Sequence, residues 1–365
     1  MLFKNVYLRS FRLFLFPFAL VYGGLIMFRN YLYDKKIIGT VVFNIPIIGV
    51  GNLSVGGTGK SPMVDYIAGL LKNQYKTATL SRGYKRRTSG YVLANHYSSS
   101  IEIGDEPMQF HLAHPEISVA VGEKRIEAVP QLLYDRPDTK VIILDDAFQH
   151  REITAGLDIV LTEYSNLYSR DFFLPTGDLR DQKESAHRAH IIVVTKCPAD
   201  LSHEAALRIK RELKLNAHQY IFFTTIEYGM PYHIISRENR QLSGSEEVLL
   251  ICGIANPLPL TQYIHESTKT YDALFYRDHH IYTIDDINDM EDRFKLIQSN
   301  EKMYLTTDKD AVRLIKFKDR IKELPFFVLP ISISFLFNQQ HLFDQLILEY
   351  PQKFYTELMA QEESI

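Results

Sequence analysis

The stretch that decides the fold is IPIIGVGNLSVGGTGKSPMVDYIAGLL, residues 45–71. It begins with a short apolar run, continues through a loop with glycines at 56, 57 and 59, and ends with apolar residues at helical spacing. A buried strand, a glycine-rich turn and an amphipathic helix in this order are typical of the first βα unit of a parallel sheet. The stretch therefore predicts an α/β fold.

The glycine loop ends in Gly59-Lys60-Ser61, which predicts a P-loop. Glycines let backbone N–H groups surround phosphate oxygens, and the following helix presents its positive N-terminal end to them. Lys60 would meet the β and γ phosphates, and the Ser61 hydroxyl would ligate magnesium. The P-loop pattern has glycine where this chain has Ser54, and a glycine-rich turn without a ligand is the alternative. The predicted nucleotide-binding residues are Ser54, Val55, Gly56, Gly57, Thr58, Gly59, Lys60 and Ser61.

A second magnesium-holding acid is needed for nucleotide hydrolysis or transfer, and VIILDDAFQHR (141–151) supplies Asp145 and Asp146 after an apolar run. Two acids after a strand are also common as a turn or helix cap, and the P-loop upstream favours the magnesium site. Residues 195–198 read Thr-Lys-Cys-Pro in place of the Asn-Lys-x-Asp run of guanine-specific enzymes, which favours ATP over GTP. Val55 stands where membrane-partitioning ATPases carry an extra lysine, which disfavours that class.

Apolar runs alternate with helical patterns from residue 45 onward, which predicts βα units. We expect a P-loop NTPase-type, mostly parallel sheet with helices on both faces over residues 37–225, a β-hairpin linker over 226–245, and a second, smaller α/β domain over 246–365. Strands are predicted at 45–50, 77–81, 118–121, 141–144, 158–162, 190–195 and 220–224. Helices are predicted at 62–73, 106–113, 123–134 and 203–213.

Length and composition exclude several classes of protein. The 365 residues are 46% apolar and 23% charged, which predicts two or three globular units. A net charge of −3 argues against a nucleic-acid binder, which would carry a basic surplus. The two cysteines, Cys197 and Cys252, are too few for a disulfide framework and indicate a reducing compartment.

The N-terminal residues 1–36 predict a hydrophobic, membrane-anchoring helix. Residues 13–28 carry no charge, and the whole segment has six basic residues and one acidic residue. The uncharged stretch is shorter than the roughly 20 residues of a spanning helix and contains Pro17, so we expect a monotopic or re-entrant anchor at an anionic leaflet. A signal peptide and a buried core helix are the alternatives.

A kinase also needs a base beside the acceptor hydroxyl. EIGDEPMQF (102–110) offers Asp105, for which a helix N-cap is the competing role. RDHH (277–280) offers Asp278, His279 and His280. SRGYKRR (81–87) is either an anion-binding loop or a solvated one, and FLPTGDLRDQ (173–182) places Arg180 and Asp181 in a Pro-Gly loop.

Taken together, these motifs closely resemble the tetraacyldisaccharide 4'-kinase family, the lipid A pathway kinases of Gram-negative bacteria. The resemblance covers nearly the whole chain. The motifs that carry it, in chain order, are GNLSVGGTGKSP, SRGYKRR, GDEPMQF, LDDAFQHR, LPTGDLRD, RDHH and TTDKDAVR.

The resemblance implies transfer of the ATP γ-phosphate to the 4'-hydroxyl of a tetraacylated glucosamine disaccharide 1-phosphate, giving lipid IVA, with ATP and Mg²⁺ as cofactors. By motif position, Asp105 looks like the catalytic base and His279 like the partner that orients it. Gln149 and Arg180 look like nucleotide-site residues. Ser61, Asp145, Asp146 and Asp181 look like metal-site residues, although Asp181 stands where the family has Glu.

The resemblance further implies a lipid substrate, contact with the membrane surface through the N-terminal helix, a place at the cytoplasmic face of the inner membrane, no nucleic-acid partner and a monomer. Two other hypotheses stay open from the residues alone. One is a membrane-associated P-loop ATPase switch or partitioning protein, and the other is a non-enzymatic nucleotide-binding scaffold.

Overall fold

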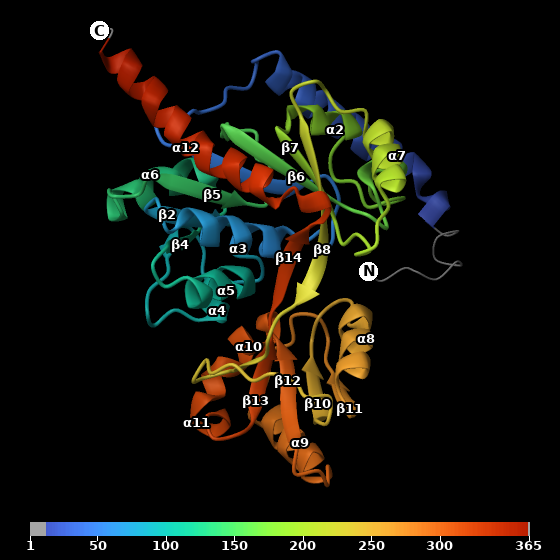
Figure 1. Ribbon diagram of the computed structural model, residues 1–365. Helices are drawn as coiled ribbons and strands as arrows, with labels where there is room; N and C mark the ends of the chain where they lie inside the picture. Colours follow the sequence, from blue (N-terminus) through green and yellow to red (C-terminus); the bar gives the residue numbers. More distant parts are fainter. Residues whose placement is uncertain (1–11, 364–365) are drawn as a thin grey trace.

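The structure, a computed structural model, describes residues 12–363 and contains two sheets that lie one beyond the other (Figure 1). The larger sheet has nine strands in the order β14-β8-β7-β6-β1-β5-β2-β4-β3. All its neighbouring strands are parallel except β14, which is antiparallel to β8, and β3, which is antiparallel to β4. The strands are β1 (Ile47–Asn52), β2 (Thr77–Ser81), β3 (Val92–Leu93), β4 (Ser118–Val121), β5 (Val141–Asp145), β6 (Leu157–Glu163), β7 (Ile191–Thr195), β8 (Tyr220–Tyr228) and β14 (Ile331–Phe335).

Helices cover both faces of this sheet, and the expected fold class is confirmed. One face packs on α3 (Lys60–Leu71), α5 (Asp105–Ala113) and α12 (Gln340–Glu362), and the other on α6 (Arg125–Asp135) and α7 (His203–Leu213). Central strands such as β1 and β5 are buried along their whole length, because helices exclude water from both sides. The short helix α4 (Ser100–Ile103) precedes α5.

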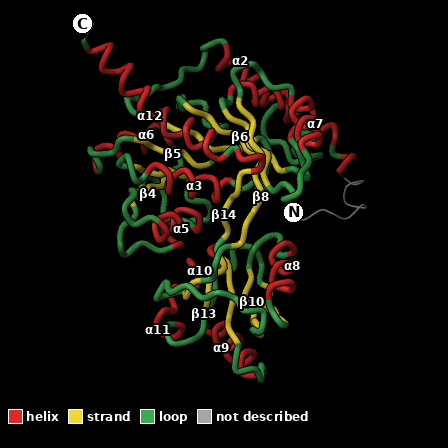
Figure 2. The backbone as a smooth tube through the Cα atoms, viewed as in Figure 1, coloured by secondary structure: helices red, strands yellow, loops and turns green. Residues whose placement is uncertain are grey.

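The smaller sheet has five strands in the order β11-β10-β12-β13-β9, parallel except for β9. Figure 2 shows its strands below the larger sheet, with β8 and β14 running between the two. Its strands are β9 (Tyr232–His233), β10 (Glu247–Cys252), β11 (Thr270–Phe275), β12 (Lys302–Thr307) and β13 (Phe326–Leu329), and its helices are α8 (Leu258–Ser267), α9 (Ile284–Lys295), α10 (Asp308–Leu314) and α11 (Lys318–Ile321).

The C-terminal segment does not stay with the smaller sheet. Residues 246–365 were expected to form one unit. Instead, β14 pairs with β8, with Ile333 opposite Ile226, and α12 packs on α3 through the fully buried Phe343. The alternating pattern of residues 331–335 marks a strand without marking its sheet, because an edge strand pairs wherever a free edge is available. We therefore call residues that belong to the larger sheet and its helices the first unit, and β9–β13 with α8–α11 the second unit.

Two chain segments connect the units, one at Gly229 and one at Pro330. They run side by side, and the Gly229 N–H donates to the Pro330 carbonyl oxygen at 2.9 Å. A linker hairpin was expected over residues 226–245. The first three of these residues are the end of β8, and the rest supply β9 and contain an antiparallel bridge between Tyr232 and Asn239. The two units are thus connected by two chain segments, one after β8 and one before β14.

The N-terminal segment forms α2 (Phe16–Asp34), and residues 1–11 of the expected anchor, with Lys4 and Arg9, lie outside the described residues. One face of α2, carrying Ala19, Gly23, Asn30 and Tyr33, is buried against the first unit. Between residues 12 and 363, no helix combines the length and apolar character needed to cross a bilayer. The exposed apolar side chains of this segment are Leu13, Phe14, Phe16, Phe18, Leu20, Val21, Leu25, Met27 and Phe28.

Candidate active site

The glycine loop lies between β1 and α3, at the edge of the sheet where the parallel strands end. Parallel α/β sheets bind ligands at this edge. Gly59 caps α3 with a φ of 86°, a left-handed conformation that favours glycine. The loop is braced from the sheet, since the Thr195 hydroxyl donates to the Thr58 carbonyl oxygen at 2.8 Å. The start of α3 thus follows directly on a fixed glycine turn, as the P-loop interpretation requires.

The first half of the predicted nucleotide segment is held by the loop that carries Arg180. Ser54 forms an antiparallel bridge with Leu179, and the Val55 N–H donates to the Asp178 carbonyl oxygen at 2.8 Å. The Arg180 N–H in turn donates to the Leu53 carbonyl oxygen. Two motifs more than a hundred residues apart thus form one wall of the site.

Asp146 is the charge partner of the P-loop lysine. Its carboxylate accepts hydrogen bonds from the Arg180 guanidinium, and Lys60 Nζ lies 3.5 Å from it. Burial raises the pKa of Asp146, but the hydrogen bond from Arg180 and the charges of Lys60 and Arg180 outweigh it, so the pKa falls below its ordinary value. Burial also lowers the pKa of Lys60, despite the neighbouring Asp146.

Asp145 differs from its neighbour. It ends β5, where it lies opposite Val50 of β1, and its Oδ1 atom is buried without a hydrogen-bond partner. Burial, followed by the charge of Asp146, raises its pKa to about 6. An unpaired buried carboxylate oxygen is a costly group that a bound cation would satisfy.

Asn52, which the sequence analysis missed, links three predicted groups. Its Oδ1 accepts from Arg180 at 2.5 Å, its Nδ2 donates to the Thr58 hydroxyl at 2.7 Å, and its backbone oxygen accepts from Gln149 Nε2 at 2.6 Å. The signal available in the sequence was a polar residue at the end of an otherwise apolar strand.

Asp181 contacts α2 more closely than the P-loop. Its Oδ1 accepts from Asn30 Nδ2 at 2.8 Å, from the Ser185 hydroxyl at 2.9 Å and from the Gln182 N–H at 2.8 Å. Its Oδ2 is buried without a hydrogen-bond partner. The metal role of Asp181 stays a prediction.

Asp105 and His279, which are 174 positions apart in the chain, meet across the two units. His279 Nδ1 and Asp105 Oδ2 are 2.7 Å apart, and both side chains are about one-eighth exposed. His279 has a φ of 62°, which is uncommon for a residue with a side chain and is often found at functional sites. The adjacent histidine has a different partner, since His280 Nε2 lies 3.0 Å from Asp286 in its own unit.

The residue after Asp105 also acts on the acid that ends β5. The charge of Glu106 contributes to the raised pKa of Asp145, after burial and the charge of Asp146. The loop of residues 82–87 borders the pair, with Tyr84 edge-on to His279. Within that loop Arg86 is held by Glu123 at 2.6 Å, and Arg82, Lys85 and Arg87 are exposed.

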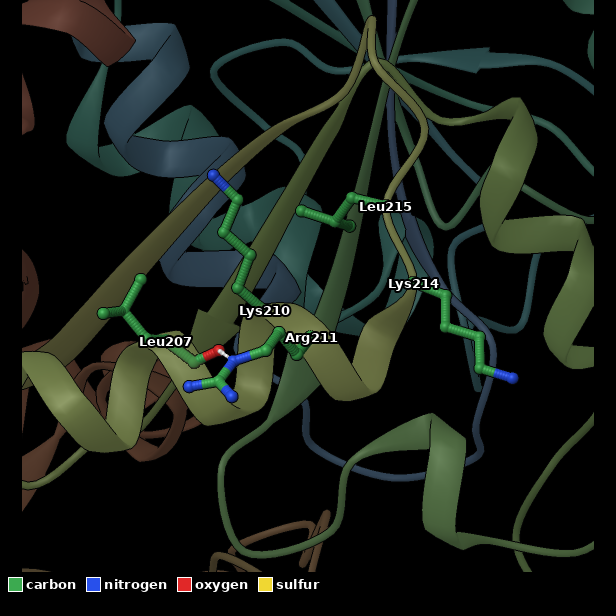
Figure 3. Close-up of a pocket in the computed structure, with 5 residues that line it drawn as sticks. All are labelled: Leu207, Lys210, Arg211, Lys214 and Leu215. Atoms are coloured by element: carbon green, nitrogen blue, oxygen red, sulfur yellow. Dashed lines mark hydrogen bonds between the residues drawn. The ribbon is translucent and has the colours of Figure 1, made fainter.

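The site is not the hollow on α7 shown in Figure 3. That hollow has a volume of about 330 Å³ and is lined by Leu207, Lys210, Arg211, Lys214 and Leu215, none of which belongs to a predicted motif. Nor do three or more His, Cys, Asp or Glu side chains gather as a metal site anywhere in residues 12–363. Mg²⁺ does not require such a cluster, because it is held by one or two carboxylates together with phosphates.

Comparison with known proteins identifies the family. The model of the tetraacyldisaccharide-1-P 4'-kinase family matches residues 11–351. The chain belongs to this family. It is 44% identical to the tetraacyldisaccharide 4'-kinase of Flavobacterium johnsoniae, over 92% of this chain and 96% of that protein. It is 41% identical to that of Parabacteroides distasonis, over 92% and 93%. The chain is accordingly a kinase.

A solved structure agrees with the fold. The crystal structure of LpxK from Aquifex aeolicus in complex with ATP matches with a TM-score of 0.72 and 27% identity, over 93% of this chain and 99% of that one. That protein binds ATP, which fits the P-loop and the choice of ATP over GTP made from residues 195–198.

Asp145→Asn should change how the free energy of unfolding depends on pH. The folded-state pKa of Asp145, about 6, lies above its ordinary value, so the contribution of this group to stability is lost as the pH rises from about 4 through 6. Asparagine removes that loss, and relative to wild type the variant should gain about 2 kcal/mol of stability between pH 4 and pH 7. Chemical denaturation of the ligand-free protein at several pH values measures this.

The matched control is Asp138→Asn, at an exposed position of the first unit. It should keep the wild-type pH dependence. If stability depends on pH in the same way for Asp145→Asn and wild type, the pKa of Asp145 is not raised in the folded protein.

Proposed function

We propose that the chain transfers the γ-phosphate of ATP to the 4'-hydroxyl of a tetraacyldisaccharide 1-phosphate, giving lipid IVA in lipid A biosynthesis. The single observation that carries the proposal is the contact between Asp105 and His279, which in our proposal supplies a proton acceptor for the alcohol that the P-loop site phosphorylates. An ATPase switch needs the P-loop and the two acids but has no use for such a pair.

The residues present fit a magnesium ion. Asp145 offers a buried oxygen without a partner, and Ser61 is the second residue of α3, directly after the P-loop lysine. In our proposal Ser61, Asp145 and Asp146 hold Mg²⁺, with Asp181 as a further ligand, and the bound ion neutralises charge on the phosphates.

Alignment and charge account for most of the proposed catalysis. Phosphoryl transfer proceeds through a loose transition state with charge spread over the phosphate oxygens. Lys60 and Arg180 supply positive charge beside the loop, and the residues 54–61 hold the triphosphate. Asp105 accepts the proton of the acceptor hydroxyl, and His279 orients the carboxylate.

The lipid substrate explains the exposed apolar face of α2. A substrate whose acyl chains stay in the bilayer must be reached at the membrane surface. We propose that α2 lies in the cytoplasmic face of the inner membrane, where its cationic flank meets anionic headgroups. In the loop 82–87, the exposed side chains of Arg82, Lys85 and Arg87 could bind an anionic headgroup or the sugar 1-phosphate.

The deciding experiment is an incubation of the full chain with MgATP and the disaccharide 1-phosphate, followed by mass analysis of the lipid. We expect one added phosphate on the non-reducing sugar. Asp105→Ala should lower turnover by roughly 10²- to 10⁴-fold with ATP binding nearly intact, as for loss of a positioned base, whereas Asp138→Ala should match wild type.

Wild-type turnover by Asp105→Ala would remove this residue from the mechanism. ATP hydrolysis with nucleotide-dependent dimerisation and no phosphorylated lipid would instead support the ATPase switch.

Membrane contact through α2 is tested by point substitution, because the buried face of α2 hydrogen-bonds the loops of the site and a deletion would disturb both. Phe18→Asp and Leu25→Asp change side chains that are 66% and 65% exposed. We expect each variant to lose most of its binding to vesicles that contain anionic lipid, measured by flotation.

Met359→Asp on α12 is the matched control, at 65% exposure on another helix, and should bind vesicles like wild type. Undiminished binding by both α2 variants would refute the anchor.

A further inference from the structure

The motif TTDKDAVR, residues 306–313, is one of the motifs shared with the kinase family, and the proposed function gives its residues no role. It ends β12 and forms α10, which packs against α5 across the junction of the two units (Figure 1). The Thr307 hydroxyl accepts from the Asp310 N–H and caps the helix. The cap fixes the start of α10, so Lys309 and Arg313, one turn apart, both reach the first residues of α5.

Arg313 contacts the same carboxylate as His279. Its Nη2 and Nε atoms donate to Asp105 Oδ2 at 2.7 and 3.0 Å. Its Nη1 donates to Asp310 Oδ1 at 3.1 Å and to the Gly253 carbonyl oxygen at 3.3 Å. The Arg313 side chain is 5% exposed. A buried guanidinium that bridges two carboxylates in this way is fixed in position.

The support for Arg313 is itself buried within the second unit. The fully buried Asp310 also accepts from the Tyr282 hydroxyl at 3.0 Å and from the Gly253 N–H at 3.0 Å. Both oxygens of Asp310 are therefore satisfied, and it has no freedom to release Arg313 without breaking several bonds.

The geometry leaves one oxygen of Asp105 free for another group. Arg313 and His279 both contact Oδ2, and among the described residues no side-chain or backbone donor is bonded to Oδ1. A carboxylate fixed through one oxygen cannot rotate, so its other oxygen keeps a constant direction. This is what a proton acceptor for a single hydroxyl requires.

We propose that Arg313 is a positioning residue: it clamps Oδ2 of Asp105 from the second unit and thereby directs Oδ1 to the acceptor hydroxyl. The inference rests on the proposed function, which makes Asp105 the base. Arg313 acts through Asp105 and need not touch either substrate.

The clamp also sets the charge of the base. Burial raises the pKa of Asp105. The hydrogen bonds from His279 and Arg313 and the charge of Arg313 outweigh that effect, so the pKa lies below its ordinary value and the carboxylate stays ionised. The other charged groups at this junction are Asp310, which pairs with Arg313, Asp278 beside His279, and the Lys309–Glu106 ion pair at 3.0 Å. A weaker base is tolerable here, because the proton is transferred late in phosphoryl transfer.

Arg313→Gln tests the proposal through kcat, KM for ATP and the pH profile of kcat. We expect kcat to fall by about 10²-fold, the scale for a misplaced catalytic group, and KM for ATP to change by less than about threefold. Loss of the guanidinium raises the pKa of the Asp105 carboxylate, so the acidic limb of the profile should move to higher pH by about one pH unit or more. In an Asp105→Asn background, Arg313→Gln should cause no further loss of kcat.

Two further variants make the result interpretable. Arg313→Lys keeps the charge but cannot bridge both carboxylates, and it should fall between wild type and Arg313→Gln. Lys309→Gln breaks the other ion pair between the units without touching Asp105, and it should keep the wild-type pH profile and a near-wild-type kcat. If Arg313→Gln does not fold, Arg313→Lys decides the question by the same measurements.

Wild-type kcat in Arg313→Gln, or in Arg313→Lys where only that variant folds, would overturn the proposal. A lowered kcat with an unmoved acidic limb and the same further loss in the Asp105→Asn background would also overturn it, because those results describe a merely structural residue. The wild-type enzyme separates this inference from the proposed function: absence of phosphorylated lipid in the wild-type reaction refutes the function, whereas an active wild type with an equally active Arg313→Gln refutes only the clamp.

Discussion

The arrangement of the two units depends on one buried carboxylate, that of Asp105, whose ion-pair partners come from the other unit. Asp105 lies at the start of α5 in the first unit, and its ion-pair partners, His279 and Arg313, both come from the second unit. An unpaired carboxylate that stays buried costs several kcal/mol, so the docked arrangement of the units requires both of these partners. The same contacts that hold the units together thus form the pair that the proposed chemistry uses.

The remaining architecture keeps the two units in reach of each other. The chain crosses between them twice, beside Gly229 and Pro330, and then returns through β14 and α12 to the first unit. On the opposite side of the nucleotide site, α2 is attached through Asn30 to Asp181 and through Arg29 to the Gln149 backbone. The first unit is therefore bonded both to a helix with an exposed apolar face and to a second unit that carries the partners of Asp105.

The sequence predicted the parts of the site that follow from local rules. A glycine loop between a strand and a helix located the P-loop, and β5 ends at Asp145 as its apolar run indicates. Asp105 and His279 were candidates from their own segments, and motif resemblance paired them as base and partner; no local pattern could show their contact, because 174 positions separate them. Asn52, Asn30 and Arg313 were missed for the same reason: each is an ordinary polar residue in its own segment and becomes significant only through partners far along the chain. The return of residues 331–335 to the larger sheet was also beyond local rules, because pairing of an edge strand is decided by tertiary contact.

The most direct test of this account is a crystal structure of the full chain with a non-hydrolysable ATP analogue, Mg²⁺ and the disaccharide acceptor. The account predicts the triphosphate in the loop 54–61, Asp105 still bonded to His279 and Arg313 through Oδ2, and Oδ1 within hydrogen-bond reach of the acceptor hydroxyl. An acceptor hydroxyl that lies away from Asp105, with the carboxylate bonded only to His279 and Arg313, would contradict it.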